Sequence, residues 1–203
     1  MILPDWEIRL LCDRGMVAPY APENINPASI DLRIDGEYYD IVNNRQVEGV
    51  IRLWPGVAVL ATTIEYVKLP TNVAGQLVLK SSMGRRGVSM PAAGWVDPGF
   101  EGTLTVQLVS YAPVRLEPGD RFIQLVLHNM ASIPDVPYKG HYQGQRGVTR
   151  AYNSDVDDGP ASLNEPANEH VIYTDRMEKI VLPNPKDNLA NYTANDAGEW
   201  MIV

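Results

Sequence analysis

Short apolar segments separated by Gly, Pro, Asn and Asp constrain the fold of this chain more than any other feature of its sequence. Turn-forming pairs such as Asp35-Gly36 and Pro118-Gly119 lie between segments that alternate in polarity or run apolar. These segments span residues 29–34, 37–42, 49–54, 57–67, 75–82, 102–110 and 121–130. Many short strands at this spacing are typical of a β-barrel or β-sandwich. The sequence therefore predicts an all-β domain.

One short helix is expected near the N-terminus, over residues 5–15. Four of its residues can share one apolar face: Trp6, Ile8, Leu11 and Cys12. Cys12 is the only cysteine, so the chain can form neither an internal disulfide nor a multi-Cys metal site. We interpret Cys12 as a core residue of this helix and not as a nucleophile.

The chain changes character from about residue 138. Residues 138–150 are Gly-rich and polar, which favours an arm or lid that closes over a ligand, the alternative being a disordered linker. Residues 154–203 carry ten acidic and three basic side chains, or −7 of the total net charge of −8. We expect one domain over residues 1–153, which includes the arm, and an acidic C-terminal extension over residues 154–203.

The charge and hydropathy of the chain exclude several classes of partner. A net charge of −8 argues against general binding to nucleic acid. No apolar run approaches the roughly 20 residues of a membrane span. Residues 1–15 carry charges where a signal peptide needs an apolar block. With the single cysteine, these features predict a cytoplasmic protein that binds neither membrane nor nucleic acid.

Residues 80–87, KSSMGRRG, combine the groups that bind phosphate oxygens. Lys80, Ser81, Ser82 and Arg85 supply an ammonium, two hydroxyls and a guanidinium beside glycine backbone. A triphosphate is the ligand we expect for this segment, and a basic surface turn is the alternative. Asp97 follows in a second turn, where an aspartate commonly binds only its own backbone.

Taken in order, these segments resemble the dCTP deaminase branch of the trimeric dUTPase superfamily. The resemblance covers residues 3 to about 150 and is carried by INPASIDLRI (25–34), LPTNVAGQLVLKSSMGRRG (69–87), AGWVDPGFEGTLTVQL (93–108) and PYKGHYQGQRG (137–147). It implies a distorted β-barrel or jelly roll with a short N-terminal helix. It also implies a homotrimer with active sites between subunits, a pyrimidine deoxynucleoside triphosphate as substrate, and Mg²⁺ carried by its phosphates.

The resemblance assigns roles to residues of the two turns. Ser81, Ser82 and Arg85 match positions that bind phosphate and assist catalysis. Asp97 matches the sugar-binding turn, which in dUTPases also supplies the carboxylate that orients water. Phe100 matches the aromatic ring that packs under the deoxyribose and disfavours a 2′-hydroxyl.

Residues of the arm complete the expected site. Tyr142 and Gln145 match the arm residues that close on the nucleotide, and Asp31 matches a supporting aspartate of the first motif. The remaining expected substrate contacts are Lys80, Trp95, Tyr138 and His141. No protein ligands for a metal are expected.

Gln107 departs from the pattern of the family's deaminases. It lies ten residues after Asp97, where those enzymes carry a Glu that takes a proton from water. A Gln amide has nearly the same size but no useful basicity, and a general base contributes about 10²–10⁴ in rate. Two more departures are VSMPAAG (88–94), which lacks the usual His and Thr, and His141, which replaces a Lys.

Three functions are compatible with this pattern. The first is a dUTPase-like hydrolase that releases pyrophosphate, with Asp97, Arg85, Ser82 and Gln107 as catalytic residues. The second is a dCTP deaminase that uses another group as the base. The third is a nucleotide-binding regulator without catalysis, in which the acidic extension binds a partner. Of the three, we expect the hydrolase, and we interpret the extension as a trimer-packing or solubilising segment.

Overall fold

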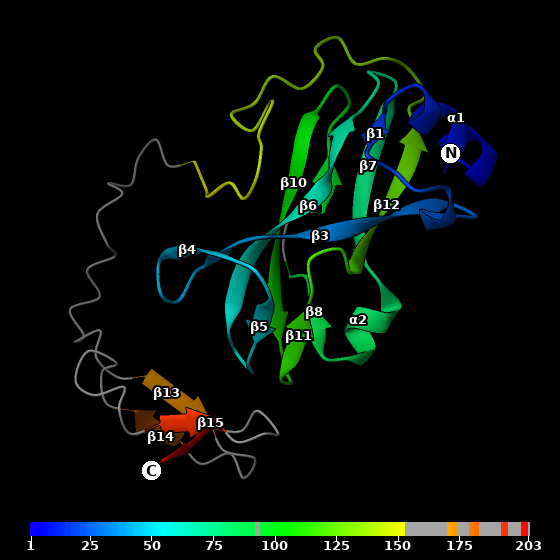
Figure 1. Cartoon of the computed structure of the whole chain (residues 1–203). Coiled ribbons are helices and arrows are strands. Elements are labelled where there is room, and N and C mark those ends of the chain that lie inside the picture. The colour runs from blue at the N-terminus through cyan, green and yellow to red at the C-terminus, as the bar shows by residue number, and fades with distance from the viewer. Residues whose placement is uncertain (92–93, 153–169, 174–178, 183–191, 195–199, 203) are drawn as a thin grey trace. The chain divides into compact units, whose positions relative to one another are not determined.

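Most of the first of two compact units, Met1–Tyr152, is a β-sheet that curls around an apolar core (Figure 1). The computed structural model describes residues 1–91, 94–152, 170–173, 179–182, 192–194 and 200–202. The ten strands of the sheet are β1 (Val17–Ala18), β2 (Ile25–Asn26), β3 (Ser29–Asp40), β4 (Arg45–Glu48), β6 (Ala58–Lys68), β7 (Val73–Leu79), β8 (Val88–Ser89), β9 (Trp95–Val96), β10 (Glu101–Ser110) and β12 (Arg121–Asn129). The predicted all-β fold is confirmed.

The order of strands in this sheet is β8-β10-β6-β3-β12-β7-β9, and β1, β2 and β4 pair with β6, β3 and β3. All these pairings are antiparallel. A separate small sheet pairs β5 (Ile51–Leu53) with β11 (Val114–Leu116). Two α-helices, α1 (Asp5–Asp13) and α2 (Ser81–Arg85), and a 3₁₀ turn, η1 (Pro22–Asn24), complete the described part of this unit.

Strand β3 corrects the prediction of a turn at Asp35-Gly36. The segments expected over residues 29–34 and 37–42 form one strand, whose register with β6 shifts between Ile34 and Tyr38. The Gly36 amide donates to the Asp35 carboxylate at 2.6 Å, and the Gly36 carbonyl accepts the Gly49 amide at 2.8 Å. The Asp-Gly pair therefore marks an irregularity inside a strand, a role that glycine also takes in sheets.

The segment expected as a strand over residues 75–82 ends earlier than predicted. Strand β7 stops at Leu79, and residues 81–85 form the single-turn helix α2. Met83, only 6% exposed, packs into the core from this helix. Burial of one side chain holds the turn against the sheet, while Ser81, Ser82 and Arg85 face outward.

Helix α1 buries a narrower face than the sequence predicted. Ile8 and Cys12 lie four residues apart on one face and are buried, whereas Trp6 is 64% exposed. Two residues along a helix correspond to roughly 200° of rotation, so Trp6 points away from the face that holds Ile8. Burial, with a smaller effect of the Asp13 carboxylate, raises the pKa of the Cys12 thiol to about 12. Such a thiol is a core group and a poor nucleophile.

Strand β10 alternates as predicted from the sequence. Leu104, Val106 and Leu108 are buried, and Thr103, Thr105 and Gln107 lie on the opposite, half-exposed face. The same outward face continues onto the next strand, β6, because Gln107 pairs with Leu60 and Thr105 with Thr62. This outward face carries the site described below.

A buried ion pair ties β3 to β6. The Glu65 carboxylate, 1% exposed, accepts the Arg33 backbone amide at 2.8 Å and the Arg33 Nε–H at 2.7 Å. Two charge-assisted hydrogen bonds to one buried carboxylate fix the two strands close to the point where their register shifts.

Of the second unit, Asn153–Val203, the structure describes four short strands. β13 (His170–Tyr173) pairs antiparallel with β14 (Lys179–Leu182), and β15 (Tyr192–Ala194) pairs antiparallel with β16 (Trp200–Ile202). The sequence of residues 170–182 is compatible with a short helix or a strand pair, and its described residues, 170–173 and 179–182, form the strand pair. The other residues of the predicted acidic extension lie outside the described residues. None of the described helices is long and apolar enough to span a membrane.

Candidate nucleotide site

A pocket of about 360 Å³ lies beside β10, lined by residues of both its faces, and we call it the β10 pocket. Residues far apart in the sequence line it, from β6, β7, β9, the turn that follows β9, β10 itself, the arm at 138–150 and Ala151. Seven residues predicted for the site are among them: Trp95, Asp97, Phe100, Gln107, Tyr138, Tyr142 and Gln145. The fold therefore gathers the predicted sugar-binding turn, the departing Gln107 and the arm in one place.

Asp97 lies in the turn between β9 and β10. Its backbone carbonyl accepts the Phe100 amide at 3.1 Å, and one oxygen of its exposed carboxylate accepts the Trp95 indole N–H at 3.0 Å. Gly99 has a φ of +84° in this turn, and a Cβ at that position would lie 2.8 Å from the Cβ of Pro137. Glycine is needed there both for the backbone conformation and for the close approach of the arm.

Phe100 forms the apolar floor of the turn. It is 5% exposed, and its ring meets that of Tyr138 edge to face, with centroids 5.7 Å apart. The Tyr138 amide donates to the Pro98 carbonyl at 2.9 Å, so the start of the arm is fixed to the same turn. An aromatic pair of this kind offers a flat apolar surface for a sugar or a base.

The arm returns along residues 101–103 of β10 and covers the pocket. The Gly144 amide donates to the Glu101 carbonyl at 2.7 Å, and the Thr103 amide donates to the Gln145 carbonyl at 3.0 Å. The Gln145 side chain donates through Nε2 to the Thr103 carbonyl at 2.6 Å. At Gly102 a Cβ would lie 3.0 Å from the Gln145 carbonyl oxygen, so this strand position admits the arm because it lacks a side chain.

Gln107 lines the pocket from the middle of β10, half-buried on its outward face. Thr105, Thr149 and Arg150 surround the same end of the pocket. Asp97 is the one acidic side chain and Arg150 the one basic side chain among the described residues that line the β10 pocket. The pocket thus presents one carboxylate, one guanidinium and several amides and hydroxyls.

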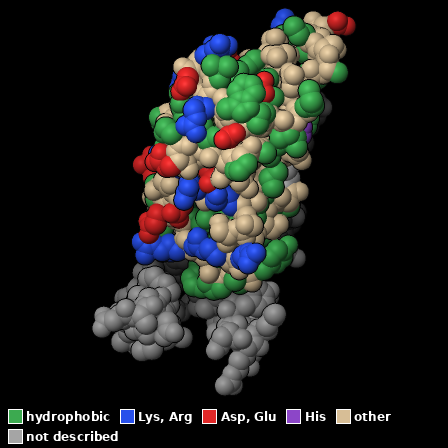
Figure 2. Space-filling view, turned by 90° about the vertical axis from the view of Figure 1, so that its right-hand side faces the viewer, with side chains coloured by type: hydrophobic (Ala, Val, Ile, Leu, Met, Phe, Trp, Pro, Cys, Tyr) green, Lys and Arg blue, Asp and Glu red, His purple; other side chains and the backbone are tan. Residues whose placement is uncertain are grey.

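The predicted phosphate segment lies apart from the β10 pocket within this chain. Ser81, Ser82 and Arg85 are exposed on α2 and do not line the pocket. In Figure 1, α2 lies toward the lower end of the sheet and the arm runs along the upper end. Figure 2 shows Lys and Arg side chains gathered toward the lower end of the face that it presents. One copy of the chain therefore does not bring the predicted phosphate and sugar residues together.

Lys80 has a defined partner inside the fold. Its ammonium donates to the carboxylate of Asp31, which is 2% exposed. Asn26 and Gln124 donate to the other oxygen of that carboxylate at 2.8 and 3.2 Å, and the Arg121 guanidinium lies 3.7 Å from the oxygen that accepts from Lys80. Lys80 thus holds the start of α2 against β3, and Asp31 is the centre of a buried polar cluster.

The predicted site residues and the residues that line the pocket are not the same set. His141 is exposed and stacks on Tyr152 at a centroid distance of 3.8 Å, outside the pocket lining. Sequence reasoning missed Thr105 and Arg150 as pocket residues. The alternation of β10 could have revealed Thr105, which shares a face with Gln107, but no sequence signal places Arg150 over the sheet.

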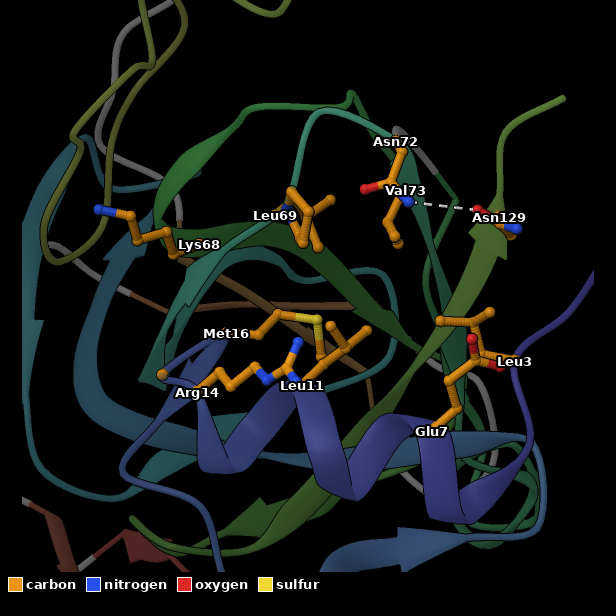
Figure 3. Close-up of a pocket in the computed structure, with 12 residues that line it drawn as sticks. Leu3, Glu7, Leu11, Arg14, Met16, Lys68, Leu69, Asn72, Val73 and Asn129 are labelled. Carbon is orange, nitrogen blue, oxygen red and sulfur yellow. Dashed lines mark hydrogen bonds between the residues drawn. The ribbon is translucent and has the colours of Figure 1, made fainter. Parts of the chain in front are cut away.

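A second hollow of about 460 Å³ lies between α1 and the β6–β7 turn (Figure 3). Leu11, Met16 and Leu69 form apolar walls, and Glu7 and Arg14 extend from the helix beside them. Although it is the larger of the two, none of the predicted site residues lines it. The β10 pocket is therefore the candidate site.

The sequence of this chain also matches that of a known protein family. The model of a family described as dCTP deaminase-like matches residues 2–130. The chain belongs to the dCTP deaminase-like family. The match contains β1 to β12 and ends before the arm, so the family includes the strands that form the floor of the β10 pocket.

Several relatives of this dCTP deaminase-like chain carry enzyme names. A protein of Pyrococcus horikoshii named dCTP deaminase is 38% identical over 150 aligned residues, which cover 71% of this chain and 92% of that protein. A protein of a Sulfurihydrogenibium species named dCTP deaminase, dUMP-forming, is 38% identical over 172 aligned residues, which cover 73% of this chain and 95% of that protein.

A solved structure shares the fold of this dCTP deaminase-like chain. The crystal structure of the 2′-deoxycytidine 5′-triphosphate deaminase of Agrobacterium tumefaciens superimposes with a TM-score of 0.56 at 20% sequence identity. The superposition covers 63% of this chain and 48% of that one, so the chain spans about half the length of this structural relative. The likeness supports the dUTPase-like β-fold that the sequence predicts.

Proposed function

We propose that this protein deaminates dCTP in the β10 pocket. The observation that carries the proposal is the 38% identity to a dCTP deaminase over 92% of that enzyme's length. The pocket supports it with a turn and an aromatic pair suited to a deoxyribose, closed by the arm. This reverses the order of the sequence analysis, which placed pyrophosphate release from dUTP first and deamination second.

Deamination replaces the amino group at C4 of cytosine with the oxygen of water and releases ammonia. A group in the pocket must take a proton from that water. Asp97 is the candidate base, because it is the one carboxylate among the described residues that line the pocket. Gln107 can hold either the water or the edge of the base, since its amide both donates and accepts hydrogen bonds.

Pyrophosphate release is a second candidate, and the amide at position 107 favours it. Hydrolysis at the α-phosphorus does not need a carboxylate at that position. Asp97 would orient the water, and Ser82 and Arg85 would stabilise charge on the phosphates. Conversion of dCTP to dUMP removes both ammonia and pyrophosphate, so the relative named dUMP-forming joins both reactions in one name.

Mg²⁺ enters this proposal as a companion of the triphosphate. Within the described residues, no three His, Cys, Asp or Glu side chains lie close enough together to hold a metal ion. The phosphate oxygens of the nucleotide would then hold the ion, where it offsets their negative charge.

We also propose that the protein works as a homotrimer. The exposed Ser81, Ser82 and Arg85 lie away from the β10 pocket of their own chain, so a second copy would have to bring them to it. Light scattering should give three times the chain mass of 22.5 kDa. A monomeric mass together with full activity would contradict the shared site. The domain over residues 1–153 would carry this function, with 154–203 as an extension.

Product analysis separates the candidate functions. The protein is incubated with dCTP or dUTP and Mg²⁺, and ammonia and pyrophosphate are measured in parallel. Ammonia from dCTP supports the main proposal, and pyrophosphate without ammonia supports the second. Tight binding of nucleotide with neither product would indicate a regulator without catalysis. Asp97→Asn should abolish the reaction, and unchanged turnover in that variant would refute the role of Asp97.

A further inference from the structure

Two arginines of the arm lie over tyrosines on the outward face of the sheet. The Arg146 guanidinium carbon lies 4.6 Å from the ring centroid of Tyr66, on β6. The Arg150 guanidinium carbon lies 5.0 Å from the ring centroid of Tyr39, on β3. Both arginines are exposed and both rings are half-buried. Both distances are within the range of an attractive cation–π contact.

The strand register places these tyrosines in two rows across the sheet, one of which includes Gln107 of the β10 pocket. Tyr66 pairs with Thr103, whose amide donates to the Gln145 carbonyl of the arm. Tyr39 pairs with Leu60, which in turn pairs with Gln107, so these three side chains form one row across β3, β6 and β10. The arm therefore crosses the sheet obliquely, from the edge of β10 over β6 to β3. Arg146 contacts the ring on β6, and Arg150 contacts the ring on β3.

Threonine hydroxyls fix the arm between the two arginines. The Thr62 and Thr103 hydroxyls donate to the Gly147 carbonyl at 3.0 and 3.2 Å. The Thr149 amide donates to the Thr105 hydroxyl at 3.0 Å. The arm backbone thus has defined partners at 147 and 149, between the rings that receive Arg146 and Arg150.

We propose that Arg146 and Arg150, with Tyr66 and Tyr39, form an arginine latch that positions the arm over the β10 pocket. None of the four was among the residues expected at the site, where Tyr142 and Gln145 were expected to close on the nucleotide. The latch acts through those two side chains, so its members are positioning residues. The inference depends on the proposed function only in taking the pocket as the nucleotide site.

The strength of the two cation–π contacts sets how far their loss should open the arm and raise KM. Each cation–π contact at an exposed position is worth about 0.5–1 kcal/mol, which changes an equilibrium by about 2.3- to fivefold. Loss of both contacts should therefore increase opening of the arm by about five- to 25-fold. Saturating nucleotide shifts the arm back to the closed state. Weaker closure therefore raises KM while kcat stays within about twofold.

Paired ring substitutions in the full-length protein test the latch. Tyr39→Leu/Tyr66→Leu removes both ring faces, and Tyr39→Phe/Tyr66→Phe is the matched control that keeps them. Hydrogen exchange of the Gly144 and Thr149 amides is measured without nucleotide. We expect it to rise about five- to 25-fold in the Leu pair and less than twofold in the Phe pair, with exchange in β6 and β12 unchanged.

Steady-state kinetics with dCTP provide the second readout. The Leu pair should raise KM with kcat nearly unchanged, and the Phe pair should behave as the parent protein. Equal exchange rates of the arm amides in the two pairs would overturn the latch, as would a fall in kcat at constant KM. If the parent protein does not turn over dCTP, the proposed function fails, and the exchange comparison alone still decides the latch.

Discussion

A carboxylate placed at position 107 tests how the β10 pocket treats water and base. Gln107 is half-buried, and its side-chain amide forms no hydrogen bond within residues 1–91 and 94–152. Glu has nearly the same size, so Gln107→Glu breaks no contact that holds the fold. We expect the free energy of unfolding to change by no more than about 0.5 kcal/mol.

The catalytic effect should be much larger than the structural one. A positioned general base contributes about 10²–10⁴ in rate, which corresponds to about 3–5 kcal/mol in the barrier. Because Gln107→Glu places a carboxylate where the family's deaminases carry theirs, we expect it to take over from Asp97 as the base and to raise ammonia release from dCTP at least about 100-fold. Its Kd for dCTP should stay within about threefold, because the sugar turn and the arm are unchanged. A coupled ammonia assay and equilibrium dialysis measure the two quantities.

Gln145→Glu is the matched control, the same substitution at another position of the same pocket. Gln145 donates through Nε2 to the Thr103 carbonyl at 2.6 Å, and a carboxylate there would place one hydrogen-bond acceptor against another. Loss of that bond costs about 1–3 kcal/mol of arm closure and should weaken nucleotide binding without a gain in ammonia. If Gln107→Glu folds and binds dCTP normally but gains less than tenfold in ammonia release, the reasoning about position 107 is wrong.

Three further predictions concern the fold and the metal. Glu65→Gln leaves one of the two Arg33 N–H groups facing the NH₂ of an amide, so the free energy of unfolding in urea should fall by about 2–4 kcal/mol. Glu117→Gln is the control, because it affects an exposed pair with Arg115 and should cost less than about 1 kcal/mol. The Cys12 thiol keeps its proton to about pH 12 in the folded protein but loses it near pH 9 in the unfolded chain. The free energy of unfolding should therefore fall by about 1.4 kcal/mol per pH unit between these values, and a Cys12→Ala variant should lack this part of the pH dependence. Chelation of Mg²⁺ with EDTA should slow nucleotide turnover without altering the far-ultraviolet circular dichroism, and a loss of folded signal would contradict a metal held by phosphate.

The sequence predicted best those elements whose pattern is local. The alternation of β10 follows from its own side chains, and the structure has Leu104 and Val106 inside with Gln107 outside. The pair Asp35-Gly36 gave the wrong prediction, because Asp-Gly is a strong turn signal in isolation. Here the hydrogen bond from Gly49 keeps the segment inside the sheet. That partner could not be read from the flanking residues.

The site was predictable where one continuous motif carries it. Asp97, Phe100 and Gln107 belong to a turn and the strand that follows, so their proximity follows from the chain itself. Arg150 reaches Tyr39 across more than 100 residues of sequence, and no periodicity links the two. In the same way Asp31 meets Lys80 only because β3 and β7 both pair with β12. Such contacts come from tertiary packing, which the sequence pattern does not encode locally.

The parallel pairing of the arm with β10 also bears on the solubility of the protein. Residues 101–103 use one side of their backbone for β6, and the arm occupies the other side through Gln145. A chain whose arm has lifted would present this bare strand margin to other molecules, and unpaired margins recruit strands from neighbouring chains. Bound nucleotide, by keeping the arm down, would then protect the protein from self-association, so concentrated preparations should keep longer with substrate analogue than without it.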